Sequence, residues 1–384
     1  MLARTSKLAA LLLLSSLPNA SARAQADDWA VERAGYRFAL FEQQGRGIQS
    51  RAGQDPLAAG SEHAWIFQSI LAMQVRQDRN AVHNIAIPVD IVTAASPDAL
   101  DAVSTASRET ESVTVDILST VQDTPHTSYQ LRMRPHFEEH WVAGSIGGAV
   151  LHSFADDNAV VRVGAEFTWD AYDEITPSGF DTGPFVNRFT LGIYAGISQL
   201  LSPTTIVSAM YSFTAQFGHL ETSYNSVPRT LGDRIAERFP RQRGRHALSG
   251  ELRQAILETS TYLALSYRFY IDSIEASAHT ARLTVTQELG DFWLRGHYRF
   301  HYQNAPYFWM AVVPGDLPLW APRTADSDLE TLHAHELGAN VRWFFQRSGA
   351  LTALSSFAQL GYLYYWRSNT LRSHVFTVEL GAGF

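Results

Sequence analysis

The sequence contains no cysteine among its 384 residues, which excludes disulfide bonds, thiolate catalysis and cysteine-type zinc sites. It also contains no Walker loop, GxSxG nucleophile elbow, HExxH motif or dinucleotide fingerprint. No apolar run approaches the roughly 20 residues that a membrane-spanning helix requires. These absences predict a protein that is not an enzyme, carries no cofactor and has no helical membrane segment.

The chain has fewer basic than acidic residues: 30 lysines and arginines against 38 aspartates and glutamates, for a net charge of −8. A nucleic-acid partner would call for a basic surface stripe, so we expect none. Aromatic residues are frequent, at 12% of the chain, and include 15 tyrosines and 9 tryptophans. Such residues form girdles at the two membrane interfaces of a barrel, or fill the core of a soluble β-sandwich.

The N-terminus has the pattern of a secretory signal peptide. Basic residues in Met1–Lys7 precede a short apolar run, Leu8–Leu14, and Ala22–Ala24 forms an A-x-A cleavage pattern. The alternative, an N-terminal membrane anchor, needs a much longer apolar run. We therefore expect residues 1–24 to be removed on export and residues 25–384 to form one domain.

Apolar residues recur with a period of two, as in β-strands that separate two environments. In residues 292–303 one face is apolar, aromatic or glycine, and residues 160–170 divide in the same way. Each segment has about the 9 to 11 residues of a tilted membrane strand, which favours lipid on one face and a lumen on the other. A soluble antiparallel sandwich also alternates, so the pattern alone leaves that fold open.

The end of the chain favours the barrel. Phe376, Val378, Leu380 and Ala382 alternate with polar residues and glycine, and the last residue is Phe384. This resembles the C-terminal strand of outer-membrane barrels, which generally ends on phenylalanine and is recognised there by the barrel insertion machinery. We expect Phe384 to be the assembly signal, and the protein to lie in the outer membrane of a two-membraned (Gram-negative) bacterium.

Tight turns and longer polar stretches should alternate along a barrel, because periplasmic turns are short and extracellular loops are long. On that basis the sequence predicts an all-β fold, a transmembrane antiparallel up-and-down β-barrel of about sixteen strands, with fourteen or eighteen left open. The predicted strands are 33–44, 62–77, 81–94, 112–121, 126–137, 141–154, 158–171, 187–201, 203–217, 245–257, 259–272, 275–289, 291–304, 333–347, 353–367 and 372–384.

Three strings in the C-terminal half carry a family resemblance: RGRHALSGELRQ from Arg243, then LALSYRFYIDSIEASAHTARL, then LRGHYRFHYQNAPYFW ending at Trp309. Together with Ile87–Ser107, they resemble an uncharacterised bacterial outer-membrane family, domain of unknown function 3570. The resemblance implies an outer-membrane barrel and no particular activity. The family has tryptophan soon after the aspartate of YRFYID, where this chain has Ile274, so a rim or lumen contact is expected to differ there.

Arginines gather on the predicted inward face of the C-terminal half. An arginine ladder across neighbouring strands would favour an anion-selective path. The alternative is that these arginines pair with acidic residues across strands and plug the lumen, since buried charges must be paired. The residues predicted to line the lumen or bind solute are Arg253, Arg268, Asp272, Arg282, Arg295, His297, Arg299, His301, Glu336 and Arg342.

Histidines do not indicate a metal or hydrolytic site. His297 and His301 share their face with arginines, which disfavour a divalent cation, and His246 and Ser249 lie on opposite faces. The arginine-rich stretch 219–245 is expected to form a loop with a short helix over Leu231–Phe239. This loop either constricts the mouth with internal ion pairs or contacts lipopolysaccharide phosphates.

Two functions are compatible with these patterns. The first is a porin-like channel or transport barrel whose lumen passes an unidentified small solute. The second is a structural or assembly protein of the outer membrane, with a blocked lumen and periplasmic or surface partners. Bulky inward residues favour constriction and small ones favour space; the bulky set is Tyr194, Tyr262, Trp293 and Phe357, and the small set is Gly164, Gly192, Ser208 and Ser212.

Overall fold

The computed structural model describes residues 29–45, 63–94, 110–175, 182–221, 226–346 and 356–384. The predicted signal peptide, residues 1–24, lies outside them. Strands account for nearly all of the regular structure, and the α-helix predicted over Leu231–Phe239 is absent from this described segment. Within the described residues, no helix is long and apolar enough to cross a membrane.

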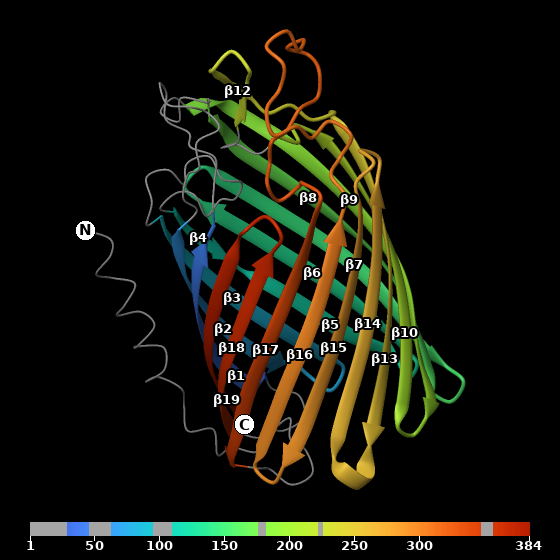
Figure 1. Cartoon of the computed structure of the whole chain (residues 1–384). Coiled ribbons are helices and arrows are strands. Elements are labelled where there is room, and N and C mark those ends of the chain that lie inside the picture. The colour runs from blue at the N-terminus through green and yellow to red at the C-terminus, as the bar shows by residue number, and fades with distance from the viewer. Residues whose placement is uncertain (1–28, 46–62, 95–109, 176–181, 222–225, 347–355) are drawn as a thin grey trace, which may run out of the picture.

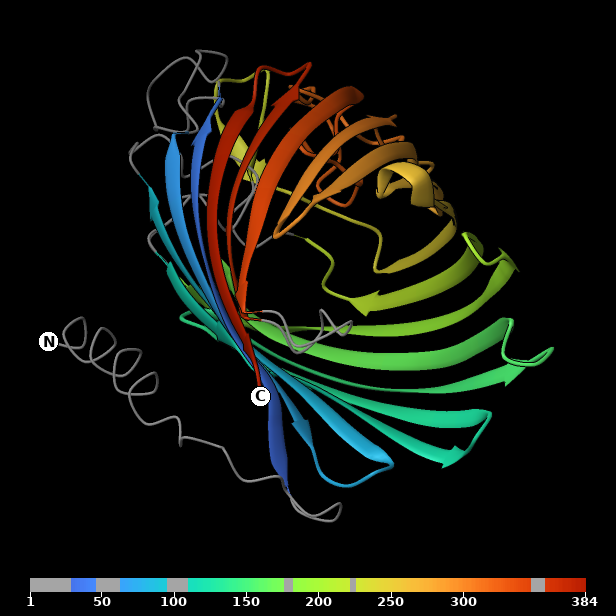
Figure 2. The ribbon, with the colours of Figure 1, turned by 90° about the horizontal axis from the view of Figure 1, so that it is seen from below.

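The strands form one antiparallel sheet that closes on itself, because β1 pairs with β2 on one side and with β19 on the other. Figures 1 and 2 show this continuous wall from the side and from below. Its strands are β1 (Ala30–Gln44), β2 (Ala64–Arg76), β3 (Ala81–Ala94), β4 (Thr110–Thr114), β5 (Asp116–Thr124), β6 (Thr127–Glu138), β7 (Trp141–Phe154), β8 (Ala159–Ile175), β9 (Thr182–Ser202), β10 (Thr205–Gly218), β13 (Gln242–Ile256), β14 (Thr261–Asp272), β15 (Ser277–Leu289), β16 (Phe292–Gln303), β17 (Leu332–Gln346), β18 (Ser356–Arg367) and β19 (Arg372–Gly383).

The barrel has sixteen strand positions, as the sequence predicts, because β4 and β5 share one position between β3 and β6. The break falls at Val115. By the register of these pairs, Pro135 of β6 lies opposite Val115, and Pro88 of β3 lies opposite Thr114. Proline donates no backbone hydrogen bond, so the ladder with β6 lacks one donor at Pro135, where the Val115 N–H still donates to the proline carbonyl at 3.0 Å.

The predicted period of two separates the faces of the barrel. Phe292, Tyr298 and Phe300 of β16 are exposed on the outside, and Val163 and Phe167 of β8 are exposed in the same way. Large apolar side chains remain exposed around the whole wall, whereas a soluble sandwich would bury them. A membrane is the solvent that accepts such a surface, because it covers apolar side chains and a closed barrel leaves no unpaired strand edge.

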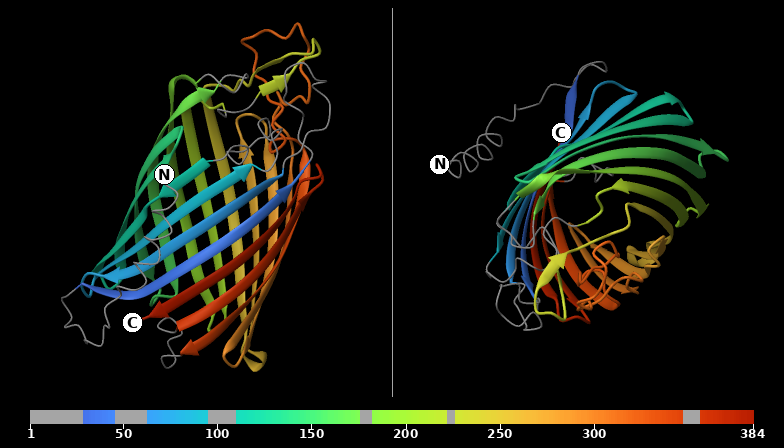
Figure 3. Two further views of the ribbon diagram at one scale, coloured as in Figure 1. Left: turned by 90° about the vertical axis from the view of Figure 1, so that its left-hand side faces the viewer. Right: turned by 90° about the horizontal axis from the view of Figure 1, so that it is seen from above.

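Among the connections that the structure describes in full, those at the end that carries the C-terminus are short turns, and the two longest segments, 226–241 and 304–331, lie at the opposite end (Figures 1 and 3). The strands are strongly tilted, as Figure 3 shows from a second side. By the usual topology of such barrels, the short turns face the periplasm. The connection between the predicted strands 158–171 and 187–201 is shorter than expected, because β8 continues to Ile175 and β9 begins at Thr182.

Two extracellular connections pack together into a cap, which we define as residues 219–221, 226–241 and 304–331. The cap contains the hairpin of β11 (Ser226–Pro228) and β12 (Arg234–Ala236), and backbone bridges join its two segments. The predicted helix over Leu231–Phe239 is wrong, because β12 finds its hydrogen-bond partners in β11. An apolar core joins the cap to the barrel rim; it is formed by Leu220, Phe239 and Phe308 of the cap and by Ile274 and Ala276 of the β14–β15 turn.

Ile274, where the family resemblance anticipates tryptophan, is 1% exposed and belongs to this core. It lies in the turn between β14 and β15, so it joins the rim of the barrel to the cap. The expected difference therefore falls at the rim. Opposite rims hold the cap: the Tyr172 hydroxyl donates to the carbonyl of His219 at 2.7 Å, and Arg367 forms an ion pair with Asp328.

Candidate functional site

The arginine ladder lies on the lumen face of three neighbouring strands. Arg268 comes from β14, Arg282 from β15, and Arg295 and Arg299 from β16. Arg282 lies directly opposite Arg299 in the register, and like charges in that position repel each other. The arrangement therefore needs a neighbouring carboxylate.

Glu336 of β17 supplies that carboxylate. It lies directly opposite Arg299, and its oxygens lie 3.5 Å from Arg299 and 3.8 Å from Arg282. The imidazole of His297 is closer still, at 2.8 Å from Glu336. One carboxylate thus holds three basic side chains, which is the cross-strand pairing predicted as the alternative to a free ladder.

Two arginines of the ladder form no ion pair with any described carboxylate. The Arg268 guanidinium lies 5.8 Å from the centre of the Tyr270 ring, and Arg295 donates to the Thr286 hydroxyl at 3.2 Å. Ion pairs with Glu336 therefore neutralise only part of the charge of the four arginines.

Asp272 does not have the lumen position predicted for it. Its side chain is fully buried, and its oxygens accept hydrogen bonds from the backbone N–H groups of Ile274 and Ala276, each at 3.1 Å. Arg243 also donates to it, at 2.9 Å. The carboxylate therefore holds the β14–β15 turn in shape and has no surface left for a solute.

The other predicted lumen residues lie at different heights. His301, near the extracellular end of β16, is held by Thr280 at 2.8 Å and Gln303 at 3.0 Å. Arg253, near the periplasmic end of β13, pairs with Glu251 on its own strand. Within the described ranges, no three histidine, aspartate or glutamate side chains gather closely enough to hold a metal ion.

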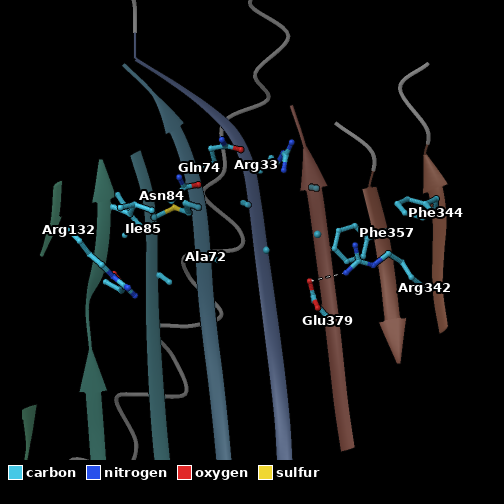
Figure 4. A pocket seen from close by; sticks show the side chains of 18 of the residues that line it. Arg33, Ala72, Gln74, Asn84, Ile85, Arg132, Arg342, Phe344, Phe357 and Glu379 are labelled. Carbon is cyan, nitrogen blue, oxygen red and sulfur yellow. Dashed lines mark hydrogen bonds and ion pairs between the residues drawn. The ribbon is translucent and has the colours of Figure 1, made fainter. Parts of the chain in front are cut away.

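A cavity of about 820 Å³ occupies the periplasmic half of the lumen. Figure 4 shows Arg342 and Glu379 on one side of it, with Arg33 and Arg132 further round the wall. Arg342 lies 3.6 Å from Glu379 and 3.9 Å from the centre of the Phe357 ring. The lining also includes Asp116, Arg162, Trp293 and Phe344.

Sequence analysis missed the N-terminal share of this lining. Asp116 and Arg132 form an ion pair, with Arg132 Nε donating to Asp116 at 2.9 Å, and Arg162 donates to the Tyr194 hydroxyl at 3.4 Å. These residues obey the same strand parity as the C-terminal arginines. Applying the period of two to every predicted strand would have found them.

Three inward rings lie close against glycines of the neighbouring strands. A Cβ at Gly164 would come within 2.5 Å of the Tyr194 ring, one at Gly338 within 2.2 Å of His297, and one at Gly381 within 2.3 Å of Phe357. The glycines therefore form niches that keep these rings out of the lumen centre. Tyr194 of the bulky set and Gly164 of the small set therefore fit together at one place on the wall.

Replacing Gly381 by alanine tests this arrangement. The new methyl group should push the Phe357 ring into the cavity, lower single-channel conductance and cost about 1 to 3 kcal/mol in unfolding free energy through overpacking. Gly192→Ala is the matched control, because its nearest neighbour would be 3.8 Å away. Equal conductance in both variants would contradict the niche.

The cap carries two buried carboxylic acids, Glu237 and Asp326. The Thr324 hydroxyl donates to Glu237, and Asp326 accepts from the backbone of Asp328 at 2.7 Å. Burial, with the negative charge of Glu237 as the next cause, raises the pKa of Asp326 well above its usual value. The folded cap therefore favours protonated Asp326.

The raised pKa predicts that the cap loosens as pH rises. Stabilisation by protonated Asp326 is fully present below the unfolded-state pKa and is lost as pH rises through the folded-state pKa. Hydrogen exchange of residues 226–239, corrected for its intrinsic pH dependence, should report this loss. Asp326→Asn should remove the pH dependence, and an unchanged pH profile in that variant would refute the assignment.

The chain end has the geometry expected of an outward-facing terminal strand. Val378 and Leu380 of β19 are exposed outside, and Phe384 follows them with 48% of its surface exposed. The Phe384 N–H donates to the carbonyl of Glu32 at 3.0 Å, so the terminus is held at the β1–β19 closure. The aromatic side chain itself stays accessible.

A protein-family profile, "Protein of unknown function (DUF3570)", matches residues 163–359. This match spans 197 of the 384 residues. The chain belongs to this family. The matched part of the DUF3570 chain runs from β8 to β18 and contains the whole arginine ladder, while the likeness seen at Ile87–Ser107 lies outside it.

No curated protein matches this DUF3570 chain. Solved structures with similar architecture include OpdK of Pseudomonas aeruginosa with vanillate, at 8% identity and a TM-score of 0.43, covering 91% of this chain and 99% of that one. A bacterial polysaccharide outer membrane secretin is 9% identical with a TM-score of 0.47, covering 94% and 100%. A BenF-like porin from Pseudomonas fluorescens Pf-5 is 8% identical with a TM-score of 0.45, covering 92% and 99%.

Proposed function

We propose that this protein is a porin-like channel for small solutes in the outer membrane of a Gram-negative bacterium, and that its lumen favours anions. The observation that carries the proposal is the unpaired positive charge on the ladder wall. Glu336 pairs with Arg282 and Arg299, while Arg268 and Arg295 form no ion pair with a described carboxylate. Charges interact more strongly in a narrow, partly dehydrated lumen than in bulk water, so this excess acts on passing ions.

Two further observations support a conducting lumen. The periplasmic half contains a cavity of about 820 Å³, and glycine niches hold Tyr194, His297 and Phe357 against the wall. The outward face is apolar around the barrel, which supports a place in lipid. The proposal contains no catalytic step and no cofactor, and its remaining partners are the insertion machinery and outer-membrane lipid, including lipopolysaccharide.

The cap favours a second function. The cap packs on an apolar core and is attached to β8 on one side and to β18 on the other. An ordered cap of this kind suits a structural or assembly barrel with a closed lumen. Its arginine-rich segment forms internal pairs, such as Arg229 with Asp233 at 2.7 Å. This supports constriction by ion pairs over the alternative contact with lipopolysaccharide phosphates.

Single-channel recording of the purified barrel in a planar bilayer distinguishes the two. Discrete conductance steps with anion preference support the channel. A folded barrel that inserts, shown by heat-modifiable migration, and still passes no current would overturn it in favour of the structural function.

A further inference from the structure

Four histidines repeat one geometry on the outside of the barrel, and the arginine-lined lumen makes no use of them. Each faces outward from a descending strand, directly opposite an aromatic residue of the strand before it. In strand order they are His246, His279, His335 and His374, and they lie opposite Phe213, Phe269, Phe300 and Tyr364.

A tyrosine two residues before each of those aromatic residues completes the unit. Its hydroxyl lies 2.6 to 2.8 Å from the histidine Nδ1, and its ring centre lies 6.1 Å from the imidazole centre in all four units. These tyrosines are Tyr211, Tyr267, Tyr298 and Tyr362. We call the four histidines and four tyrosines the histidine belt.

The belt lies at one height. The aromatic residue opposite each histidine is the ninth residue of its strand, β10, β14, β16 or β18. With a rise of about 3.3 Å per residue and a tilt of about 40°, nine residues reach roughly 22 Å above the periplasmic edge. The apolar band of such barrels is about 25 Å tall, so the belt lies just below the outer-leaflet headgroups.

The hydrogen-bond geometry leaves a donor facing outward. When tyrosine donates to Nδ1, the neutral imidazole carries its proton on Nε2. In the part of the chain that the structure describes, Nε2 of these four histidines has no protein partner. Four N–H groups therefore point from the wall at the level where lipid phosphates and sugars begin, and a buried donor there costs free energy unless it is bonded.

Charge and ring content favour one kind of occupant. Arg372 is exposed on the outer face two residues before His374, so the belt has a fixed cation on its headgroup side. Phosphate oxygens accept from such N–H and guanidinium donors, and flat aromatic rings suit the faces of sugars. We propose that the histidine belt binds the phosphorylated sugar headgroups of outer-leaflet glycolipid, with Nε2 of each histidine donating to phosphate or sugar oxygen.

This inference uses the proposed outer-membrane location but is independent of conduction. It also covers only the strands from β10 to β19. Among the described residues of β1 to β9, no outward tyrosine bonds a histidine in this way. The belt therefore marks one side of the barrel as the glycolipid-binding side.

The test is binding of diphosphoryl lipid A to the purified full-length barrel in mixed micelles, measured by native mass spectrometry. Replacing all four histidines by phenylalanine keeps the rings and removes the donors, and should weaken binding by about tenfold or more. His152→Phe is the matched control, because His152 is exposed on the outer face of β7 near the periplasmic end and bonds Thr127 instead of a tyrosine. It should bind as the parent does.

A second variant separates positioning from packing. Tyr→Phe at all four belt tyrosines keeps the apolar surface but frees the imidazoles, so binding should weaken several-fold while heat-modifiable migration stays normal. Undiminished binding by the folded His→Phe variant would overturn the proposal. Equal affinity of the parent for dephosphorylated lipid A would overturn it as well, and neither result bears on conductance.

Discussion

Replacing Arg268 and Arg295 together by glutamine should move the reversal potential of the barrel toward cation preference. These two arginines form no ion pair with a described carboxylate, so their removal takes two positive charges from the lumen and leaves no acid without its partner. In a tenfold salt gradient, ideal selectivity corresponds to about 59 mV, and a shift on the order of 10 mV or more is expected.

Two other double variants test whether the shift in reversal potential comes from the unpaired arginines. Arg253→Gln with Glu251→Gln removes one ion pair without changing net charge, so the reversal potential should stay where it is. Arg282→Gln with Arg299→Gln leaves Glu336 with His297 alone and should lower the unfolding temperature, because a carboxylate loses its two arginines. An open, conducting Arg268/Arg295 variant with the parent's reversal potential would rule out the anion path.

Deleting Phe384 should greatly reduce the amount of folded barrel in cells, whereas Glu379→Gln should have a small effect. Both residues belong to the terminal strand region, but they differ in what they contact. Glu379 faces the lumen and meets Arg342 at 3.6 Å, while Phe384 presents its ring outside the closure of β1 and β19. Heat-modifiable migration of outer-membrane fractions measures both.

Refolding in detergent separates recognition from stability. Phe384 is 48% exposed, so its ring contributes little packing to the folded barrel. The purified, denatured deletion variant should therefore refold about as well as the parent once no insertion machinery is involved. Failure in detergent as well as in cells would show that Phe384 acts through stability and not as an assembly signal.

The sequence by itself determined the architecture. A strand that faces lipid on one side and a lumen on the other must alternate apolar and polar side chains. Its turns need residues such as Gly290 and Asp157, both of which have positive φ. The sequence therefore shows how many strands there are and which side chains face the lipid. Each predicted strand overlaps one strand position of the barrel. The two prolines beside the break at Val115 are present in the sequence, but only the strand pairing shows that Pro88 and Pro135 lie on its two sides.

The prediction of a helix over Leu231–Phe239 is wrong because the local sequence pattern does not show which other segments lie alongside these residues. In the structure, β12 pairs with β11, and Arg323 from a segment 87 residues away donates to the carbonyl of Ala236 at 2.9 Å. β11 lies in the same connection as β12, whereas Arg323 comes from another loop, between β16 and β17. Ile274 likewise gains its role only where the rim turn meets the cap core.

Pairing of charge was decided by tertiary structure. Strand parity placed Asp272 and Glu336 on the same face as the arginines, yet Asp272 folds back onto its own turn while Glu336 meets Arg282 and Arg299. The difference lies in register and in height along tilted strands, which depend on how all sixteen positions close. For the same reason the histidine belt was invisible in the sequence: Phe213 and His246 are 33 residues apart, Phe269 and His279 only 10, and only barrel closure brings both pairs to one height.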